Sequence, residues 1–302
     1  MINITHKSST LRIATAQAVV EVSHEDVIKA VVEKKVPKGD VFEMAKVAGL
    51  FAAKKTSDMI PDCHPLPIEY TLITFEIIDL LIHIRVEIHT IYKTGVEVEA
   101  MHAASVVALT IYDMLKPLDK NITIQQIKLI EKKGGKSSFK FHNQSLRAAV
   151  IVCSDSISSG EKEDKAGLAI SKKLNAYNIE TVEYIIVPDE IDEIQEKLIS
   201  FSSQQIDLII YTGGTGLSPR DVTPEAIKPL LEKEIYGIEE AIRSYGQMRT
   251  PYSMLSRSVA GIIGESVVLA LPGSTKGAEE SMDAIFPAIL HTFQVIKGSR
   301  HD

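Results

Sequence analysis

Several short motifs in the first half of the chain carry side chains that could do chemistry. Lys38 opens residues 38–41 (KGDV) and precedes an amphipathic segment. A mobile cation beside a helix N-terminus is a reasonable place for a phosphate oxygen. The alternative is an ordinary helix start, in which Asp40 is the cap and Lys38 is solvated.

Residues 60–65 (IPDCHP) place Cys63 and His64 between two prolines. Prolines on both sides make the segment extended and stiff, so His64 could act as a hydrogen-bond donor or a general acid or base. A structural loop histidine is the alternative. The other histidines of this half show no metal-ligand spacing, which disfavours a metal site.

Two carboxylate motifs follow. Glu97 and Glu99 flank Val98 at an expected strand end, where their side chains would share a face and could divide acid and base roles. They could equally be exposed residues at a helix entry. Asp113 ends an otherwise apolar helix, and Lys116 lies at i+3, so the pair is either structural or a tuned acid–base couple.

The second half carries a glycine-rich loop, residues 212–216 (TGGTG), after an apolar strand. Its glycines let backbone N–H groups converge on an anion, although the loop is neither a P-loop nor a G-x-G-x-x-G motif. Thr223 and Pro224 then predict a helix cap and the first helical residue. Asp221, just before them, either complements the helix dipole or contacts a magnesium ion or a ribose.

Asp189, in residues 188–190 (PDE), also follows an expected strand. It could approach Asp221 across a cleft, and Mg²⁺ prefers one or two carboxylates together with phosphate oxygens. Residues 271–274 (LPGS) precede a helix expected from about residue 278. There Ser274 could help to bind an anion or could form only a turn and a cap.

The predicted helices and strands that position these groups follow one another in a different order in the two halves. The first predicts a β-hairpin over residues 68–91 and helices over 25–33, 41–56 and 99–115, without a strict βαβ order. The second predicts strands at 147–153, 183–187 and 206–211, alternating with helices at 165–175 and 191–200. Such alternation is typical of a doubly wound parallel sheet, whose ligands bind at the carboxyl ends of the strands.

Composition narrows the functional classes. The 302 residues are about two domains long, and a net charge of −7 argues against a nucleic-acid partner. Cys63 and Cys153 lie in different halves, so no disulfide framework or C-x-x-C site is expected. Neither a signal peptide nor an uninterrupted apolar run of about 18 residues is seen, so we predict a cytoplasmic protein without a membrane partner.

Together, the motifs of the first half resemble the cyclic pyranopterin monophosphate synthase family (MoaC) over roughly residues 1–140. The matching text comprises residues 38–41, 52–56, 60–61, 63–65, 93–100, 103–105, 109–114 and 134–137. The resemblance implies conversion of a cyclised dihydro-GTP intermediate to cyclic pyranopterin monophosphate, with release of pyrophosphate. The sequence departs from the family's usual residues at two positions: Asp62 stands where leucine is usual, and Val98 stands where methionine is frequent.

The resemblance also implies residue roles, without a tightly bound cofactor. Asp113 matches the family's acid–base position, and Lys38 and Lys116 match lysines near the reacting centre. The side chains implied to hold the pterin-forming part of the substrate are Cys63, His64, Glu97, Val98 and Glu99. The candidates for triphosphate contacts are Arg12, Lys54, Lys132 and Lys136.

Residues 147–298 resemble the molybdopterin-binding domain of the MogA, MoaB and gephyrin-like families. The motifs that carry this likeness are residues 154–155 with Gly160, 188–190, 212–216, 219–226, 255–257 and 271–274. The resemblance implies adenylylation of molybdopterin by Mg-ATP. It makes Asp189 and Asp221 catalytic and metal-linked, and the implied nucleotide or pterin contacts are Gly213, Gly214, Thr215, Gly216 and Ser274.

We therefore expect an α+β, ferredoxin-like domain over residues 1–143. An α/β three-layer domain with a mostly parallel sheet should follow over residues 147–302, after a short polar linker. The alternative is that the C-terminal half is a non-catalytic pterin-binding or oligomerisation module. Both resembled families form symmetric assemblies, which implies a homo-hexamer built as a trimer of dimers.

Overall fold

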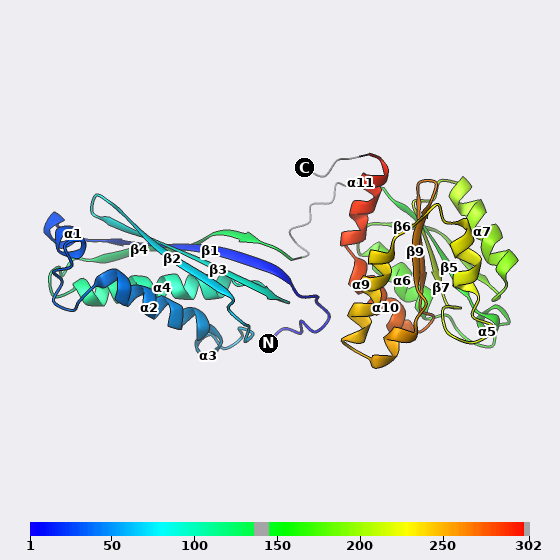
Figure 1. Ribbon diagram of the computed structural model, residues 1–302, viewed down its shortest axis with the longest axis horizontal. Coiled ribbons are helices and arrows are strands. Elements are labelled where there is room, and N and C mark those ends of the chain that lie inside the picture. The colour runs from blue at the N-terminus through cyan, green and yellow to red at the C-terminus, as the bar shows by residue number, and fades with distance from the viewer. Residues whose placement is uncertain (136–144, 299–302) are drawn as a thin grey trace. The chain divides into compact units, whose positions relative to one another are not determined.

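The computed structural model describes residues 1–135 and 145–298, and the chain divides into two compact units, Met1–Ser138 and Phe139–Asp302 (Figure 1). Each unit has its own core, because the buried apolar clusters of the two units share no residue.

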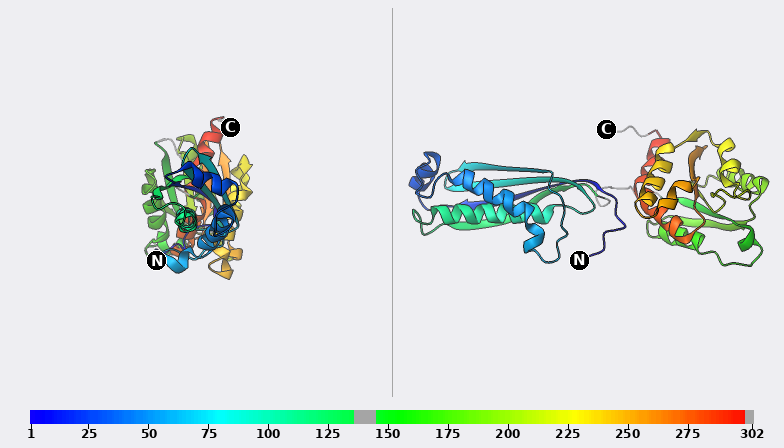
Figure 2. Two further views of the ribbon diagram at one scale, coloured as in Figure 1. Left: turned by 90° about the vertical axis from the view of Figure 1, so that its left-hand side faces the viewer. Right: turned by 60° about the horizontal axis from the view of Figure 1, so that its bottom comes forward.

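The first unit is a four-stranded antiparallel sheet with helices on one face (Figures 1 and 2). Its strands are β1 (Thr10–Glu21), β2 (Tyr70–Ile78), β3 (Leu81–Tyr92) and β4 (Thr123–Lys133). Its helices are α1 (Glu25–Val32), α2 (Val41–Lys54), α3 (Thr56–Met59) and α4 (Glu97–Leu115). The order β2-β3-β1-β4 and the β-α-β-β-α-β succession confirm the ferredoxin-like prediction.

Strand β3 shows why the chain folds this way. Ile82, Ile84, Val86 and Ile88 are fully buried, and the residues between them are partly or fully exposed. This period of two places one face of the sheet on the helices. The predicted hairpin over residues 68–91 is confirmed by the pairing of β2 with β3.

Helix α4 is the central helix of this unit. Four fully buried alanines, Ala100, Ala103, Ala104 and Ala108, belong to the apolar core beneath the sheet. Among the described residues it is the one helix whose length and mean hydropathy would allow it to cross a membrane, and half of that stretch is buried. It is therefore the core helix of this unit.

The second unit is a six-stranded sheet of order β6-β5-β7-β10-β9-β8. Its parallel strands are β5 (Arg147–Cys153), β6 (Glu180–Val187), β7 (Leu208–Thr212) and β10 (Ser266–Leu271). The antiparallel strands β9 (Val259–Ile263) and β8 (Lys233–Glu234) complete one edge. A mostly parallel sheet is confirmed.

Helices cover both faces of this sheet, which confirms the three-layer prediction. Along β5, Ala148 and Val150 belong to one buried cluster, whereas Ala149 and Ile151 belong to another. The first cluster includes residues of α6 (Ala166–Asn175), α9 (Tyr236–Gln247), α10 (Thr275–Ile285) and α11 (Thr292–Ile296). The second includes α7 (Ile191–Ser203) and α8 (Thr223–Ile227).

Short elements complete this unit: the helix α5 (Asp155–Ser158) and the 3₁₀ turns η2 (Lys228–Leu230), η3 (Pro251–Leu255) and η4 (Ala288–His291). One predicted helix start is wrong by a residue. Thr223 is the first residue of α8 and its hydroxyl caps nothing, since Val222 holds the cap position.

Candidate active sites

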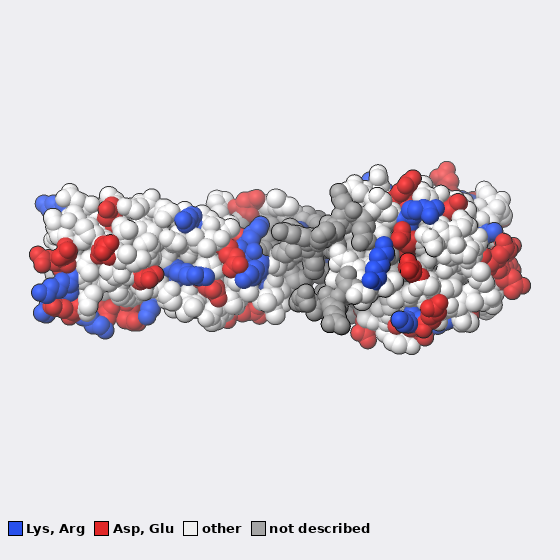
Figure 3. Space-filling view, turned by 90° about the horizontal axis from the view of Figure 1, so that it is seen from above, with Lys and Arg blue, Asp and Glu red and all other residues white. Residues whose placement is uncertain are grey.

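Charged side chains of both signs lie beside one another on the face shown in Figure 3. Any binding of an anionic small molecule must therefore be sought in local clusters. Three such clusters involve the residues singled out from the sequence.

The first cluster joins Lys38, Asp113 and Lys116. Lys38 Nζ lies 2.7 Å from Asp113 Oδ2 and also donates to the Asp113 carbonyl at 2.8 Å. Lys116 Nζ lies 2.8 Å from Asp113 Oδ1. The ammonium groups of Lys116 and Lys38 hold the pKa of Asp113 at about 2, so this carboxylate is ionised at neutral pH.

The loop before α2 brings Lys38 to the end of α4. Gly39 adopts a φ of +103°, and Asp40 then caps α2 by accepting from the Glu43 N–H at 3.2 Å. The capping interpretation of Asp40 is thus confirmed, whereas Lys38 is engaged by Asp113 rather than merely solvated. About half of the Asp113 and Lys116 side chains is exposed, so a ligand could reach them.

The second cluster lies at the other end of α4. Cys63 Sγ–H donates to Glu99 Oε1 at 3.2 Å, and Glu99 Oε2 is buried without a hydrogen-bond partner. Burial raises the pKa of Glu99, and burial and the Glu99 carboxylate raise the pKa of Cys63 to about 11. Cys63 is therefore a thiol that donates a hydrogen bond, not a reactive thiolate.

Glu97 and Glu99 do not share a face, so that prediction is wrong. Helix α4 begins at Glu97, two residues earlier than expected. Residues two apart on a helix are separated by about 200° around its axis, whereas on a strand they point the same way. Glu99 turns into the protein, and Glu97 turns to Lys132, whose Nζ lies 3.3 Å from Glu97 Oε1.

Arg12 lies beside this cluster on β1. Its Nε donates to the Tyr92 carbonyl at 3.3 Å, and burial lowers its pKa while Glu97 raises it. A Cβ at Gly135 would overlap the Arg12 guanidinium, so glycine there lets the cation lie against the backbone. Lys136, the next predicted anion contact, lies outside the described residues.

The other predicted residues of this unit are more exposed. His64 Nε2 lies 2.7 Å from the Ile2 carbonyl oxygen, which makes the ring a donor in that contact. Lys54 is the exposed last residue of α2, and Val98 is exposed in the first turn of α4.

Within one chain the first two clusters do not meet. Glu99 and Asp113 are 14 residues apart on the same helix, and at 1.5 Å per residue that is about 21 Å. Cys63 belongs to the Glu99 end, whereas Lys38 and Lys116 belong to the Asp113 end. One chain therefore carries two separate clusters, one at each end of α4.

The third cluster surrounds the glycine loop of the second unit. Gly213 and Gly214 have φ values of +103° and +60°. A Cβ at Gly213 would overlap the Cys153 carbonyl oxygen, and one at Gly214 would lie 2.9 Å from Asp189 Oδ1. The Gly213 N–H donates to the Leu271 carbonyl oxygen at 3.1 Å, and this bond connects the glycine loop to the turn at residues 271–274. These positions require glycine.

Asp189 and Asp221 both approach this loop. Asp189 Oδ1 is buried without a hydrogen-bond partner, and burial raises the pKa of Asp189, with a smaller rise from the Asp221 charge. Asp221 Oδ2 accepts from the Ser218 N–H at 2.7 Å, and a Cβ at Gly216 would lie 2.8 Å from it. Thr215, between these glycines, is buried.

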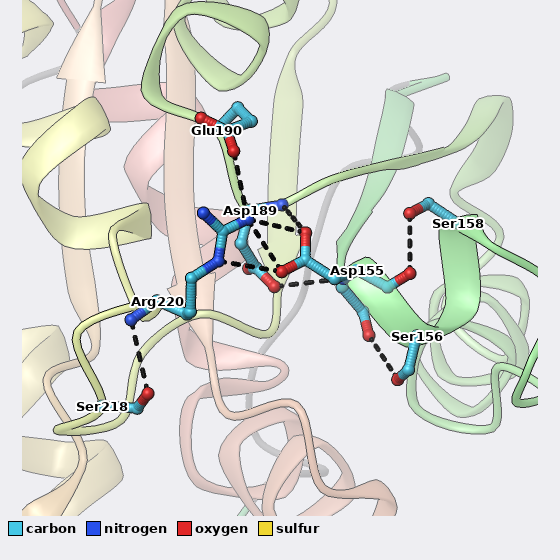
Figure 4. Close-up of polar contacts among 8 residues, drawn as sticks. Asp155, Ser156, Ser158, Asp189, Glu190, Ser218 and Arg220 are labelled. Atoms are coloured by element: carbon cyan, nitrogen blue, oxygen red, sulfur yellow. Dashed lines mark hydrogen bonds and ion pairs between the residues drawn. The ribbon is translucent and has the colours of Figure 1, made fainter.

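Three residues without a predicted role complete the cluster. Asp155 accepts two hydrogen bonds from Arg220 Nη2, at 2.8 and 3.0 Å, and one from Arg220 Nε at 3.0 Å (Figure 4). Arg257 donates to the carbonyls of Gly216, at 2.7 Å, and Asp221, at 2.6 Å. All three lie in segments that carry the family likeness, which is the signal that could have identified them.

Ser274 forms the predicted helix cap. Its Oγ accepts from the Gly277 N–H at 3.2 Å and caps α10, which begins at Thr275 rather than near residue 278. It also lines a cavity of about 200 Å³. Other residues lining that cavity are Thr250, Tyr252, Ser253, Ser256, Pro272, Lys276 and Ser281.

Comparison with known proteins follows the division of the chain. Residues 1–135 match the MoaC family, and residues 149–291 match a probable molybdopterin binding domain. A molybdenum cofactor biosynthesis bifunctional protein of Chlorobaculum tepidum is 40% identical over 100% of this chain and 96% of its own length.

Two further matches cover about half of the chain each. A cyclic pyranopterin monophosphate synthase of Nitratidesulfovibrio vulgaris is 46% identical over 45% of this chain and 86% of its own length. The crystal structure of a molybdopterin biosynthesis enzyme MoaB from Thermus thermophilus is 40% identical, with a TM-score of 0.49, over 52% of this chain and 99% of its own length.

Proposed function

We propose that this chain, which belongs to the family of bifunctional molybdenum cofactor biosynthesis proteins, carries two separate active sites. Residues 1–143 would act as a cyclic pyranopterin monophosphate synthase, a lyase. Residues 147–302 would act as a molybdopterin adenylyltransferase. We place the protein in the cytoplasm.

The observation that carries the first reaction is Asp113 held between Lys38 and Lys116. An ionised carboxylate can accept a proton from the cyclised dihydro-GTP intermediate, and a protonated lysine beside it can return one. The two ammonium groups also oppose the negative charge of the departing pyrophosphate. We call this cluster at the Asp113 end of α4 the first half-site of the synthase, and it would perform the chemistry.

The second half-site would hold the substrate. Glu99 and the Cys63–His64 pair supply hydrogen-bonding groups for the pterin-forming part, and Arg12 with Lys132 supplies positive charge for the triphosphate. Lys54 and Lys136 are further candidates for that charge. Because the half-sites are about 21 Å apart in one chain, we propose that a second copy completes each site, in a hexamer built as a trimer of dimers.

The observation that carries the second reaction is the unpartnered Asp189 Oδ1 beside the glycine loop. A buried carboxylate oxygen without a donor fits a cation, and Mg²⁺ needs only one or two carboxylates when phosphate oxygens supply the other ligands. No cluster of three or more metal-ligating side chains occurs in the described part of the chain, which suits a metal that arrives with a nucleotide. Asp189 and Asp221 would hold it.

The residues of the chain would then bind and orient two substrates. The backbone of Gly213–Gly216 would hold the phosphates of ATP, and the cavity lined by Ser274 would hold the pterin. The molybdopterin phosphate would attack the α-phosphate of ATP, releasing pyrophosphate and forming adenylylated molybdopterin. Bound Mg²⁺ would neutralise phosphate oxygens during that transfer.

The first activity is tested with the full chain, the cyclised GTP intermediate and mass spectrometry of the product. We expect Asp113→Asn to lower the rate by about 10²–10⁴-fold, the usual contribution of a general acid–base group, with an unchanged circular dichroism spectrum. Asp58→Asn is the matched control, because Asp58 is exposed and is also paired with a lysine three residues away. Full activity in Asp113→Asn would remove Asp113 from the mechanism.

The second activity is tested with the full chain, molybdopterin and Mg-ATP. Formation of adenylylated molybdopterin, and its loss in Asp189→Asn and Asp221→Asn, are the expected results. Binding of molybdopterin without any adenylylated product would favour the alternative, a non-catalytic pterin-binding or oligomerisation module.

A further inference from the structure

Three loops of the second unit meet at Asp155. They follow β5, β6 and β7, which are neighbouring parallel strands. The carboxyl ends of these strands therefore lie at the same edge of the sheet. Asp155 is the first residue of α5, at the end of the first of these loops, whereas Asp189 and Glu190 lie in the second and Arg220 in the third. Figure 4 shows the side chains of Asp189 and Arg220 directed toward Asp155, and that of Glu190 directed toward Arg220.

Asp155 and Asp189 hold each other by a reciprocal pair of hydrogen bonds. The Asp155 N–H donates to Asp189 Oδ2 at 3.2 Å, and the Asp189 N–H donates to Asp155 Oδ1 at 3.0 Å. One oxygen of Asp189 is thereby fixed, and the other, Oδ1, is left beside Gly214 without a donor. The orientation of the proposed metal-binding oxygen thus depends on Asp155.

Asp155 also anchors the third loop through Arg220. Its two oxygens accept from Nε and Nη2 of the guanidinium, and Arg220 Nη2 reaches Glu190 Oε1 at 3.1 Å as well. A planar guanidinium bound at two positions fixes direction as well as distance. Asp221, the other proposed metal ligand, is the residue next to Arg220, so the same contact restrains it.

The ion pair between Asp155 and Arg220 is too exposed to add much to the stability of the fold. The side chains of Asp155 and Arg220 are 46% and 56% exposed, and ion pairs so open to water contribute little to stability. Five hydrogen bonds join Asp155 to Asp189 and Arg220, which is more than a simple surface contact requires.

We propose that Asp155 is a positioning residue of the C-terminal site. It sets the Asp189 carboxylate and the Arg220–Asp221 segment relative to the glycine loop, and it acts through them rather than on the substrate. The inference rests on the proposed adenylyl transfer for its effect on catalysis, but not for its effect on the loops.

Two substitutions in the full-length protein separate the contacts. Asp155→Asn keeps an oxygen for the Asp189 N–H but loses the charge that binds Arg220, whereas Asp155→Ala loses both contacts. Glu196→Gln is the control, since it neutralises an exposed carboxylate of α7 in the same unit. The readouts are amide hydrogen exchange of residues 188–190 and 217–222 without ligand, and separate kcat and KM values for ATP.

We expect faster exchange of residues 217–222 in both variants, and faster exchange of the Asp189 amide in Asp155→Ala. We also expect kcat to fall about 10-fold in Asp155→Asn and about 100-fold in Asp155→Ala, the order of loss for a displacement near 1 Å. KM for ATP should stay within about threefold, because the glycine loop is untouched. The control should match the wild type.

Unchanged exchange in Asp155→Ala would overturn the proposal, and so would faster exchange with a wild-type kcat, since Asp155 would then position nothing that the reaction uses. A wild-type protein without adenylyl transfer would instead reject the proposed function. In that case the exchange data alone would decide whether Asp155 positions these loops.

Discussion

Glu99 is a carboxyl group kept where its charge is unfavourable. Only 2% of the residue is exposed, Oε2 has no hydrogen-bond partner, and burial raises its pKa above the ordinary value of 4.5, with the nearby Glu97 charge acting in the same direction. A raised pKa means that folding favours the protonated form. The N-terminal unit therefore loses stability as the pH rises from about 4.5 through the pKa of folded Glu99.

We expect Glu99→Gln to stabilise the N-terminal unit at pH 7–8 by removing this buried charge. The rise in Tm should be about 2–5 °C, the response of a domain of this size to a change near 1 kcal/mol. Below pH 4 the two proteins should unfold at the same temperature, because wild-type Glu99 is then protonated too. Thermal unfolding followed by circular dichroism across this pH range measures both effects.

The same substitution should impair synthase activity by about 10–100-fold, the usual loss when a charged hydrogen-bonding partner is removed. A residue that costs stability and supports activity has the profile of a functional site. If Glu99→Gln lowered Tm at pH 8 instead, the carboxylate would be stabilising the fold and this interpretation would be wrong.

Among the elements, the glycine loop after β7 depends most on its residue type. Gly213 combines a left-handed φ with direct packing against the Cys153 carbonyl, so a side chain there meets both backbone strain and a clash. We expect Gly213→Ala to destabilise the C-terminal unit by about 2–4 kcal/mol, which is more than strain alone usually costs. Denaturant unfolding of the full chain should show a lower midpoint for that unit.

Gly160→Ala is the matched control for this loop. Gly160 also has a positive φ, +79°, but nothing lies within 4 Å of an added Cβ. It should therefore show backbone strain of about 1 kcal/mol without the clash. Equal effects of the two substitutions would mean that packing against Cys153 contributes nothing.

The elements also show what the sequence could reveal and why the rest was hidden. Strand β3 alternates with a period of two and was predicted, whereas β1 is buried over Ala14–Ala16 and Ala18–Val20 and shows no alternation. Its alanines are poor strand formers, and they signal close packing rather than a strand. Strand β4 is a mostly exposed edge rich in lysine and glutamine, which resembles a polar loop.

The candidate site was predictable in its residue types and less so in its geometry. The Asp113–Lys116 pair followed from i+3 spacing, but the reach of Lys38 across to α4 could not, because it joins residues 75 positions apart. A two-residue error in the start of α4 was enough to reverse the prediction for Glu97 and Glu99. The spacing of two residues predicts whether their side chains meet only when the first and last residues of their helix or strand are predicted correctly.

On the scale of the whole molecule, the decisive feature is that the proposed synthase site is divided between the two ends of α4. Glu99 marks one end and Asp113 the other, about 21 Å away. If two chains related by a twofold axis exchange these ends, each dimer holds two sites, and each site takes one half from each chain. Two impaired variants with defects at opposite ends should then complement each other.

The expected recovery can be calculated for a 1:1 mixture of Asp113→Asn and Glu99→Gln that is dissociated and reassembled. Half of the dimers are mixed, and one of the two sites in each mixed dimer carries both substitutions while the other carries neither. About a quarter of all sites should therefore be wild type, and activity should return to about 25%.

A mixture of Asp113→Asn with Lys116→Gln, both at the same end, should recover nothing, because every site retains one defect. Activity no higher than the mean of the two variants would show that each chain works alone, and the half-sites would have to be joined in some other way.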